Sequence, residues 1–354
     1  MLKTATCIMT SSSILLLASD PSPIEHPTLP SSDPYAPKGS HLFTSAEWIY
    51  WQANETGLCY ALNNPDFDIV DDTIMGSGYA AQPKFDWRSG VRLGIGYTFP
   101  HDQWESSLTW TWYTGQAADS QTSSGETPTV LPVFIHPNLY NAGAIAACLS
   151  ADSNLFLHLN VIDLGLGKQV KLSKSVSIRP HVGIRSAWLN QSYNINYTQL
   201  FEKIGNIVLD EYSTNISNDF WGMGMVGGFG SQWDLKWGLS FFGDATLSLL
   251  YGFFETSIAE SFITPSGNGN LVVSNENNFR AGRAIVDLQL GLRWTSPCFK
   301  ERCMLVLQGG WEQHMYFSQN QIMHFTDAQS WGNFVQNQGD VDFQGLSLGA
   351  SLYF

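Results

Sequence analysis

The sequence predicts an all-β protein: a transmembrane, antiparallel, up-and-down β-barrel of about ten strands. Strand numbers from about eight to about twelve are compatible with the same pattern. Residues 346–354 alternate strictly between apolar residues and Ser, Gly or Tyr, and longer alternating segments recur upstream. Successive strand side chains point to opposite faces, so one face of each segment meets apolar surroundings. No run of about 17 to 25 apolar residues follows the first 20 residues, which excludes membrane-spanning helices there. Closed strands are then the remaining way to pair backbone groups in lipid.

The composition fits one barrel domain and argues against some partners. The chain has 354 residues, of which 44% are hydrophobic and 14% are charged. The formal net charge is -14, from 17 Lys and Arg against 31 Asp and Glu. Binding to a phosphate backbone needs Lys and Arg, so we expect no nucleic acid partner.

The amino terminus predicts export. Residues 1–18 are expected to be a signal peptide, because Lys3 precedes an apolar stretch. Residues 19–40 are Pro-rich and predict a periplasmic lead-in without packed structure, followed by the barrel over 41–354 with five long extracellular loops. Removal of the signal peptide takes Cys7 with it. Four cysteines then allow three pairings, and both a local disulfide and unpaired thiols stay open for Cys298 and Cys303.

The extended segments alternate between tight turns and long connections. Short periplasmic turns and long extracellular loops are typical of outer-membrane barrels, and an even strand number places both termini in the periplasm. A further hairpin over 130–135 and 139–148 would raise the count to twelve. The expected strands are 42–53, 85–99, 103–114, 155–170, 175–193, 219–233, 237–254, 279–295, 301–316 and 341–354. The expected long loops are 54–84, 115–154, 194–218, 255–278 and 317–340.

The alternation also assigns the two faces of each strand. Leu288, Leu290 and Leu292 fall on one side, opposite Asp287 and Gln289. An Arg or Lys on the lipid face costs about 2 to 4 kcal/mol at the bilayer midplane, so six of the eight arginines are expected inside. The residues predicted to line the interior are Asp86, Arg88, Arg92, Glu105, Asp163, Arg179, His181, Arg185, Asp244, Arg283, Asp287, Arg293 and Glu312, together with His158 and His314. Trp and Tyr near strand ends indicate aromatic girdles. A soluble β-sandwich is disfavoured, because strands in soluble proteins are usually only about five or six residues long, whereas the segments expected here are much longer.

Whether the interior is open stays undecided at the level of sequence. A barrel of about eight strands is filled by its own side chains, and ten lies close to that limit. Many inward positions are glycine, which leaves room for a narrow aqueous passage. The same glycines could instead relieve backbone crowding in a tightly curved sheet. Lumenal charges tune ion passage if they stay solvated, whereas charges that pair across the lumen would form a polar plug.

Two amino-terminal stretches resemble a known family. AEWIYWQANETGLCYA (46–61) and FDWRSGVRLGIGY (85–97) are similar to the opening signature of the major-outer-membrane-protein-like, pore-forming barrels of chlamydial and legionella-type bacteria. The carboxy-terminal strand ending at Phe354 is also similar. The resemblance implies an outer-membrane porin for small solutes and carries no catalytic residue. The four mature cysteines are fewer than in the disulfide-crosslinked chlamydial porin, which disfavours an extensive crosslinked network.

We therefore expect a porin-like outer-membrane channel for passive diffusion of small hydrophilic solutes. Acidic loops would make it weakly cation-favouring. The alternative is a closed-lumen barrel that acts as a surface adhesin or envelope structural protein through its long loops. No enzyme activity, cofactor or metal is expected, because the histidines have no serine partner by spacing and the acidic cluster at 66–72 lacks calcium-loop spacing. The expected partners are outer-membrane lipid and small hydrophilic solutes; a homo-oligomer and disulfide-linked envelope partners stay open.

Overall fold

A computed structural model describes residues 41–65, 78–99, 104–125, 127–137, 139, 145–202, 206–298, 303–326 and 332–354. The expected signal peptide at 1–18 and the lead-in at 19–40 lie outside the described residues. Within these described ranges, no helix combines the length and apolar character needed to cross a membrane.

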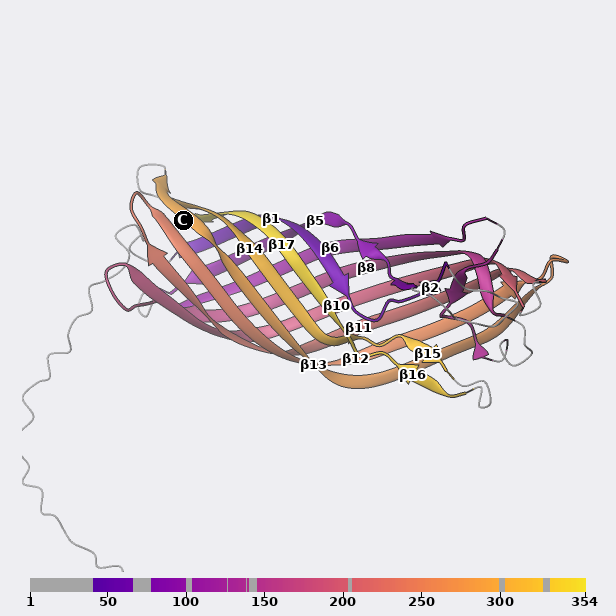
Figure 1. Cartoon of the computed structure of the whole chain (residues 1–354). Coiled ribbons are helices and arrows are strands. Elements are labelled where there is room, and N and C mark those ends of the chain that lie inside the picture. Colours follow the sequence, from indigo (N-terminus) through magenta and orange to yellow (C-terminus); the bar gives the residue numbers. More distant parts are fainter. Residues whose placement is uncertain are drawn as a thin grey trace, which may run out of the picture. The chain divides into compact units, whose positions relative to one another are not determined.

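Ten long strands form a closed antiparallel ring (Figure 1). They are β1 (His41–Glu55), β5 (Trp87–Thr98), β6 (Trp104–Thr122), β8 (Ala147–Lys168), β10 (Val176–Phe201), β11 (Ile207–Asp234), β12 (Leu239–Ile263), β13 (Gly269–Cys298), β14 (Cys303–Asn320) and β17 (Gly339–Tyr353). Barrel strands that follow each other in the chain pair with each other, and the pairing of β1 with β17 closes the ring. The predicted fold class is confirmed.

Short strands lie at the extracellular end of the ring. They are β2 (Ala61–Asn63), β3 (Tyr79–Ala81), β4 (Lys84–Phe85) and β7 (Val130–Pro132), with a separate hairpin of β15 (Met323–Phe325) and β16 (Phe334–Gln336). At the other end, β9 (Val170–Lys171) pairs with the start of β10. Among the described residues of 130–135 and 139–148, the extra barrel hairpin is not formed, because β7 pairs with β2 and meets β8 only at Cys148. Residues 138 and 140–144 lie outside the described residues.

Tight connections close the periplasmic end. In the turn from β11 to β12, Trp237 and Gly238 both have positive φ, at 60° and 76°. Glycine adopts this conformation without steric cost, which suits it to a two-residue hairpin turn. Cys298 and Cys303 form a disulfide where β13 passes to β14. Cys59 and Cys148 are free thiols.

The face assignment holds over most of the membrane-facing region. On β13, Leu288, Leu290 and Leu292 are 47%, 58% and 51% exposed, whereas Asp287 is buried inside. Comparable exposed apolar side chains occur on all ten strands, including Leu93, Leu108, Leu164, Ile184, Met225, Leu249, Leu307 and Leu348. Exposed Trp and Tyr side chains border this apolar belt, including Trp48, Trp87, Trp104, Trp221, Trp233, Tyr251, Trp294 and Trp311.

Two inward placements were wrong, those of Asp86 and His158. Asp86 is exposed and lies between β4 and β5, and Phe85 beside it is buried in the core rather than in lipid. The break in strand pairing between these residues resets the alternation, which sequence periodicity cannot detect. His158 is exposed on the outer side of β8, where it contacts the indole Nε1 of Trp112 at 2.9 Å.

Several strands run far beyond the membrane. β10 to β13 contain 25 to 30 residues, whereas a tilted strand needs about 9 to 11 to cross. On β10 the exposed side chains change from Val182 and Ile184 to Asn190 and Asn194, while the buried positions become Leu189 and Tyr193. The barrel thus reverses its polarity above the belt. Much of the expected loops at 194–218 and 255–278 is therefore strand.

Candidate functional site in the barrel lumen

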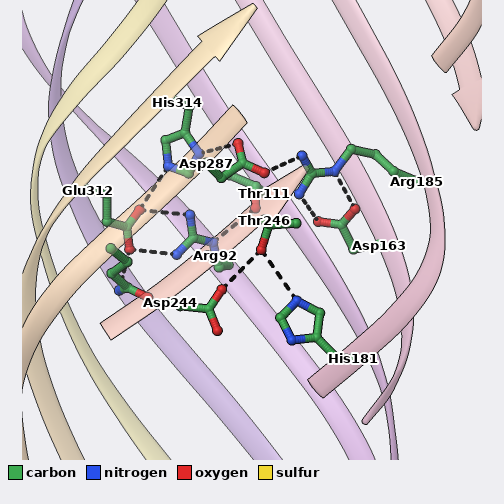
Figure 2. Close-up of polar contacts among 11 residues, drawn as sticks. Arg92, Thr111, Asp163, His181, Arg185, Asp244, Thr246, Asp287, Glu312 and His314 are labelled. Carbon is green, nitrogen blue, oxygen red and sulfur yellow. Dashed lines mark hydrogen bonds and ion pairs between the residues drawn. The ribbon is translucent and has the colours of Figure 1, made fainter. Parts of the chain in front are cut away.

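A chain of buried ion pairs crosses the middle of the lumen (Figure 2). Arg92 of β5 binds Glu312 of β14 with two parallel contacts, Nη1–Oε1 and Nη2–Oε2, both at 2.9 Å. Its Nη1 also lies 2.8 Å from Oε2 of Glu47 on β1. The Glu312 side chain is only 1% exposed. Bidentate pairing of this kind fixes the guanidinium in one geometry.

A second arginine continues the chain. Arg185 of β10 binds Asp163 of β8 through Nε at 2.6 Å and Asp287 of β13 through Nη1 at 2.6 Å. His314 of β14 joins the two halves, because its Nδ1 lies 2.8 Å from Asp287 and its Nε2 lies 3.1 Å from Glu312. Only the imidazolium form donates from both ring nitrogens. The connected residues come from six different barrel strands, so they bridge opposite walls.

An aromatic layer covers this network on the extracellular side. Trp51, Tyr113, Tyr316 and Phe343 come from four barrel strands, with ring centroids 5.6 to 6.2 Å apart. Each of the four side chains is at most 3% exposed. These four belong to one contiguous buried cluster, which takes residues from nine barrel strands and from inward-folded segments. The described lumen is therefore closed by packed apolar side chains toward the outside.

Three tyrosines on the barrel wall hold the inward segments in place. The Tyr193 hydroxyl donates to the Leu58 carbonyl at 2.9 Å, and the Tyr197 hydroxyl donates to the Tyr60 carbonyl at 2.6 Å. The backbone N–H of Phe134 donates to the Tyr197 oxygen at 3.0 Å. The Tyr212 oxygen likewise accepts a hydrogen bond from the backbone N–H of His136, at 3.1 Å.

The hairpin of β15 and β16 packs against the same inward segment. The Nε2 of His324 on β15 lies 2.9 Å from the Val133 carbonyl oxygen, and its ring centroid lies 5.0 Å from that of Phe134. Burial lowers the pKa of His324 below its ordinary value. A neutral imidazole can donate to this carbonyl from Nε2, which suits a side chain packed against an aromatic ring.

The periplasmic half of the lumen stays polar and hollow. A cavity of about 210 Å³ lies at the ion-pair network and includes Arg92, Asp287 and Asp244 in its lining. A second cavity of about 340 Å³ lies toward the periplasmic strand ends, and we call it the periplasmic vestibule. Its lining includes Glu105, Ser177, Arg179, His181, Gln232, Asp244, Arg293, Gln308 and Tyr353. Arg179 binds Glu105 there at 2.5 Å.

The residues predicted for the interior thus fall into distinct places. Five of them, Arg92, Asp163, Arg185, Asp287 and Glu312, join the central network. Another five, Glu105, Arg179, His181, Asp244 and Arg293, line the vestibule. Arg283 lies on the extracellular side of the central network, with its guanidinium 4.5 Å from the Phe254 ring centre. Arg88, at the start of β5, donates to the Gln116 side chain. Asp86 is not inside.

Glu47 and Gln308 were missed as site residues. The alternation over 42–53 places Glu47 on the same side as Phe43 and Ile49, which are buried, so that signal was available. Gln308 accepts from Arg293 at 3.1 Å and donates to Glu47 at 2.6 Å, which links the vestibule to the central network. A glutamine within a strand carries no comparable signal in the sequence.

The inward glycines fit the crowding interpretation. A Cβ added at Gly224 would overlap the Leu249 carbonyl oxygen of the neighbouring strand, and one at Gly183 would overlap the Leu164 carbonyl. These positions permit close approach of adjacent strands in a tightly curved sheet. They do not by themselves widen the lumen.

A closed antiparallel ring with an apolar belt outside and buried charges inside defines an outer-membrane β-barrel protein. The family model described as the Legionella pneumophila major outer membrane protein precursor matches residues 36–354. The chain belongs to this family, and its place is the bacterial outer membrane. This confirms the resemblance seen in the two amino-terminal stretches. No curated protein matches the chain.

Solved structures of outer-membrane proteins resemble the chain only distantly. The outer membrane protease OmpT from Escherichia coli is 10% identical, with 89% of this chain and 96% of that chain covered and a TM-score of 0.42. A major outer membrane protein from Thermus thermophilus is 13% identical, with coverage of 89% and 100% and a TM-score of 0.32. Ail, the attachment invasion locus protein of Yersinia pestis, is 10% identical, with coverage of 89% and 99% and a TM-score of 0.23. Scores at this level carry no argument about activity.

Proposed function

We propose that this protein is a closed-lumen outer-membrane barrel with a structural and surface-contact role. The observation that carries the proposal is the buried aromatic layer of Trp51, Tyr113, Tyr316 and Phe343, which lies over an ion-pair network that spans the lumen. Packed interiors have few voids as large as a water molecule. A solute would have to displace these side chains to pass, so the geometry favours the alternative of a closed barrel over the passive pore.

The wall that extends above the membrane supports the surface role. Its outer face is polar, with exposed residues such as Asn190, Asn194, Glu255 and Glu276, and its inner face is apolar. Such a wall has the layering of a water-soluble barrel and holds the loops well above the lipid. A rigid polar projection is suited to contact with the cell's surroundings or with neighbouring envelope components.

A second candidate is a gated pore with the same fold. The cavities of about 210 Å³ at the network and 340 Å³ below it favour it, because both have charged side chains in their lining and solute could enter them from the periplasm without crossing the aromatic layer. The inward segments held by Tyr193 and Tyr197 would then be the gate. The weak cation preference expected from acidic loops belongs to this candidate.

Planar-bilayer recording separates the two functions. The purified, folded wild-type barrel should be silent if the lumen is closed, and frequent stepwise currents would overturn the closed-barrel proposal. Tyr197→Phe removes only the hydroxyl that binds the Tyr60 carbonyl and the Phe134 amide. Tyr251→Phe is the matched control, because Tyr251 is 63% exposed on the lipid side. Currents that appear only in Tyr197→Phe would support the gated pore.

We also propose that the protein is not an enzyme. In the central network, both ring nitrogens of His314 face carboxylate oxygens of Asp287 and Glu312. A histidine held in this way has no nitrogen left to accept a proton from a nucleophile. The purified protein should leave peptide and ester substrates uncleaved, and turnover that is lost in His314→Gln would contradict the proposal.

A further inference from the structure

The periplasmic vestibule contains an arginine without an acidic partner. Arg293 of β13 donates through Nη1 to the Gln232 side-chain oxygen at 3.0 Å and through Nη2 to that of Gln308 at 3.1 Å. Its Nε is buried and has no hydrogen-bond partner among the described residues. The guanidinium lies 4.8 Å from the centre of the Phe242 ring. Two of the five N–H donors of the guanidinium are therefore engaged, both with neutral amides.

The nearby arginine is already neutralised. Arg179 also lines the vestibule, and its Nη2 lies 2.5 Å from Glu105. Within the described residues, no carboxylate lies within ion-pair distance of Arg293. A positive charge at this depth favours an anionic group, since guanidinium binds carboxylate with two parallel hydrogen bonds.

An unpaired carboxylate lies further up the same cavity. Asp244 of β12 accepts a hydrogen bond from the Thr246 hydroxyl at 3.0 Å, and no cation lies within ion-pair distance of it among the described side chains. His181 reaches it only indirectly, because its Nε2 lies 3.3 Å from the Thr246 oxygen. Figure 2 shows one Asp244 oxygen directed at Thr246 and the other without a drawn partner.

The two charges lie in one cavity, which suits a small ligand that carries both signs. Asp244 pairs with Gln289 on β13, four positions before Arg293 on that strand. Four residues of strand span about 13 Å at roughly 3.3 Å per residue. Both side chains line the same vestibule, so one molecule inside it can reach both charges. The vestibule volume of about 340 Å³ accommodates such a molecule.

We propose that the periplasmic vestibule binds a small zwitterion of the α-amino-acid class. Its carboxylate pairs with Arg293, and its ammonium group pairs with Asp244. The glutamines at 232 and 308 hold the guanidinium in position from either side. This site opens from the periplasmic half of the lumen, so it does not depend on whether the extracellular half conducts.

Ligand-observed NMR on the full-length barrel in detergent micelles tests the site with three probes. L-Alanine carries both charges, acetate only the negative one and ethylamine only the positive one. Alanine should bind at least about tenfold more tightly than either half-ligand, because each charge-assisted contact contributes on that scale. Arg293→Gln and Asp244→Asn should each weaken alanine binding about tenfold or more.

Matched controls neutralise a charge of the same sign on the outer wall. Arg280→Gln and Glu255→Gln alter exposed residues of β13 and β12 and should leave alanine binding unchanged. Heat-dependent gel mobility shows that each variant is folded. If Arg293→Gln does not fold, Asp244→Asn and the preference for alanine over acetate still decide the question. Failure of alanine to bind, or equal binding of acetate with no effect of Asp244→Asn, would overturn the proposal.

Discussion

The pair of Arg92 and Glu312 offers a direct measure of how dry the lumen is. The Arg92 side chain is 17% exposed and the Glu312 side chain 1% exposed, and two contacts of 2.9 Å join them. Loss of one partner of a buried ion pair costs about 3 to 5 kcal/mol, because the remaining charge has no compensation. An exposed pair contributes only about 0.2 to 1 kcal/mol. The two cases differ enough to be measured.

A double-mutant cycle of Arg92→Gln and Glu312→Gln gives the value. We expect each single variant to lose about 3 to 5 kcal/mol, and Arg92→Gln to lose more, since it also leaves Glu47 without its arginine. The double variant should be less destabilised than the sum by about 2 kcal/mol or more, because it leaves neither charge of the pair behind.

Urea titration of the barrel in lipid vesicles, followed by tryptophan fluorescence in both the folding and unfolding directions, provides the free energies. Heat-dependent gel mobility gives an independent folded fraction. A coupling energy below about 1 kcal/mol would be that of a solvated pair. Such a result would refute the reasoning for a closed lumen at this level.

Two further predictions address the faces of the barrel and its free thiols. Leu290→Arg should impair membrane assembly strongly, because a charge on the lipid face at the midplane costs about 2 to 4 kcal/mol. Gln289→Arg should be tolerated, because position 289 faces the polar lumen. Equal assembly yields of the two variants in vesicles would contradict the face assignment. Burial raises the pKa of the Cys59 thiol, so its thiolate fraction at pH 8 is below that of an exposed cysteine. Labelling by a thiol reagent should therefore still accelerate strongly between about pH 9 and pH 10, where an exposed cysteine with a pKa of about 8.5 is already mostly thiolate. The fully buried Cys148 should stay unlabelled in the folded barrel. A rate at Cys59 that is already constant by about pH 9, as for an exposed cysteine, would contradict this.

The membrane-spanning part of the fold could be predicted from the sequence, because lipid requires apolar side chains on one face of every strand. Leu288, Leu290 and Leu292 alternate with polar residues that could not face hydrocarbon, so periodicity alone placed them. Above the belt this arrangement reverses. Ile195 and Tyr197 point inward and Asn194 and Asn196 outward, a pattern that the sequence shows equally clearly but that a lipid-based interpretation takes for a polar loop.

The site was only partly accessible from sequence. The inward placement of Arg92, Arg185 and Glu312 followed from alternation, but their pairing depends on which strands face each other across the ring. The closure of the lumen could not be predicted from the sequence. It depends on Leu58 and Phe134, which lie in connecting segments where no periodicity predicts inward folding.

The seam of the ring sets a condition on biosynthesis. β1 and β17 join the two ends of the barrel sequence, with Phe43 opposite Tyr353 and their rings stacked at 4.9 Å. Until β17 has been synthesised, β1 and β14 each lack one neighbour and expose open backbone edges. A chain that lacks β17 would carry two unmatched edges into hydrocarbon, so the ring can close in lipid only once β17 is present.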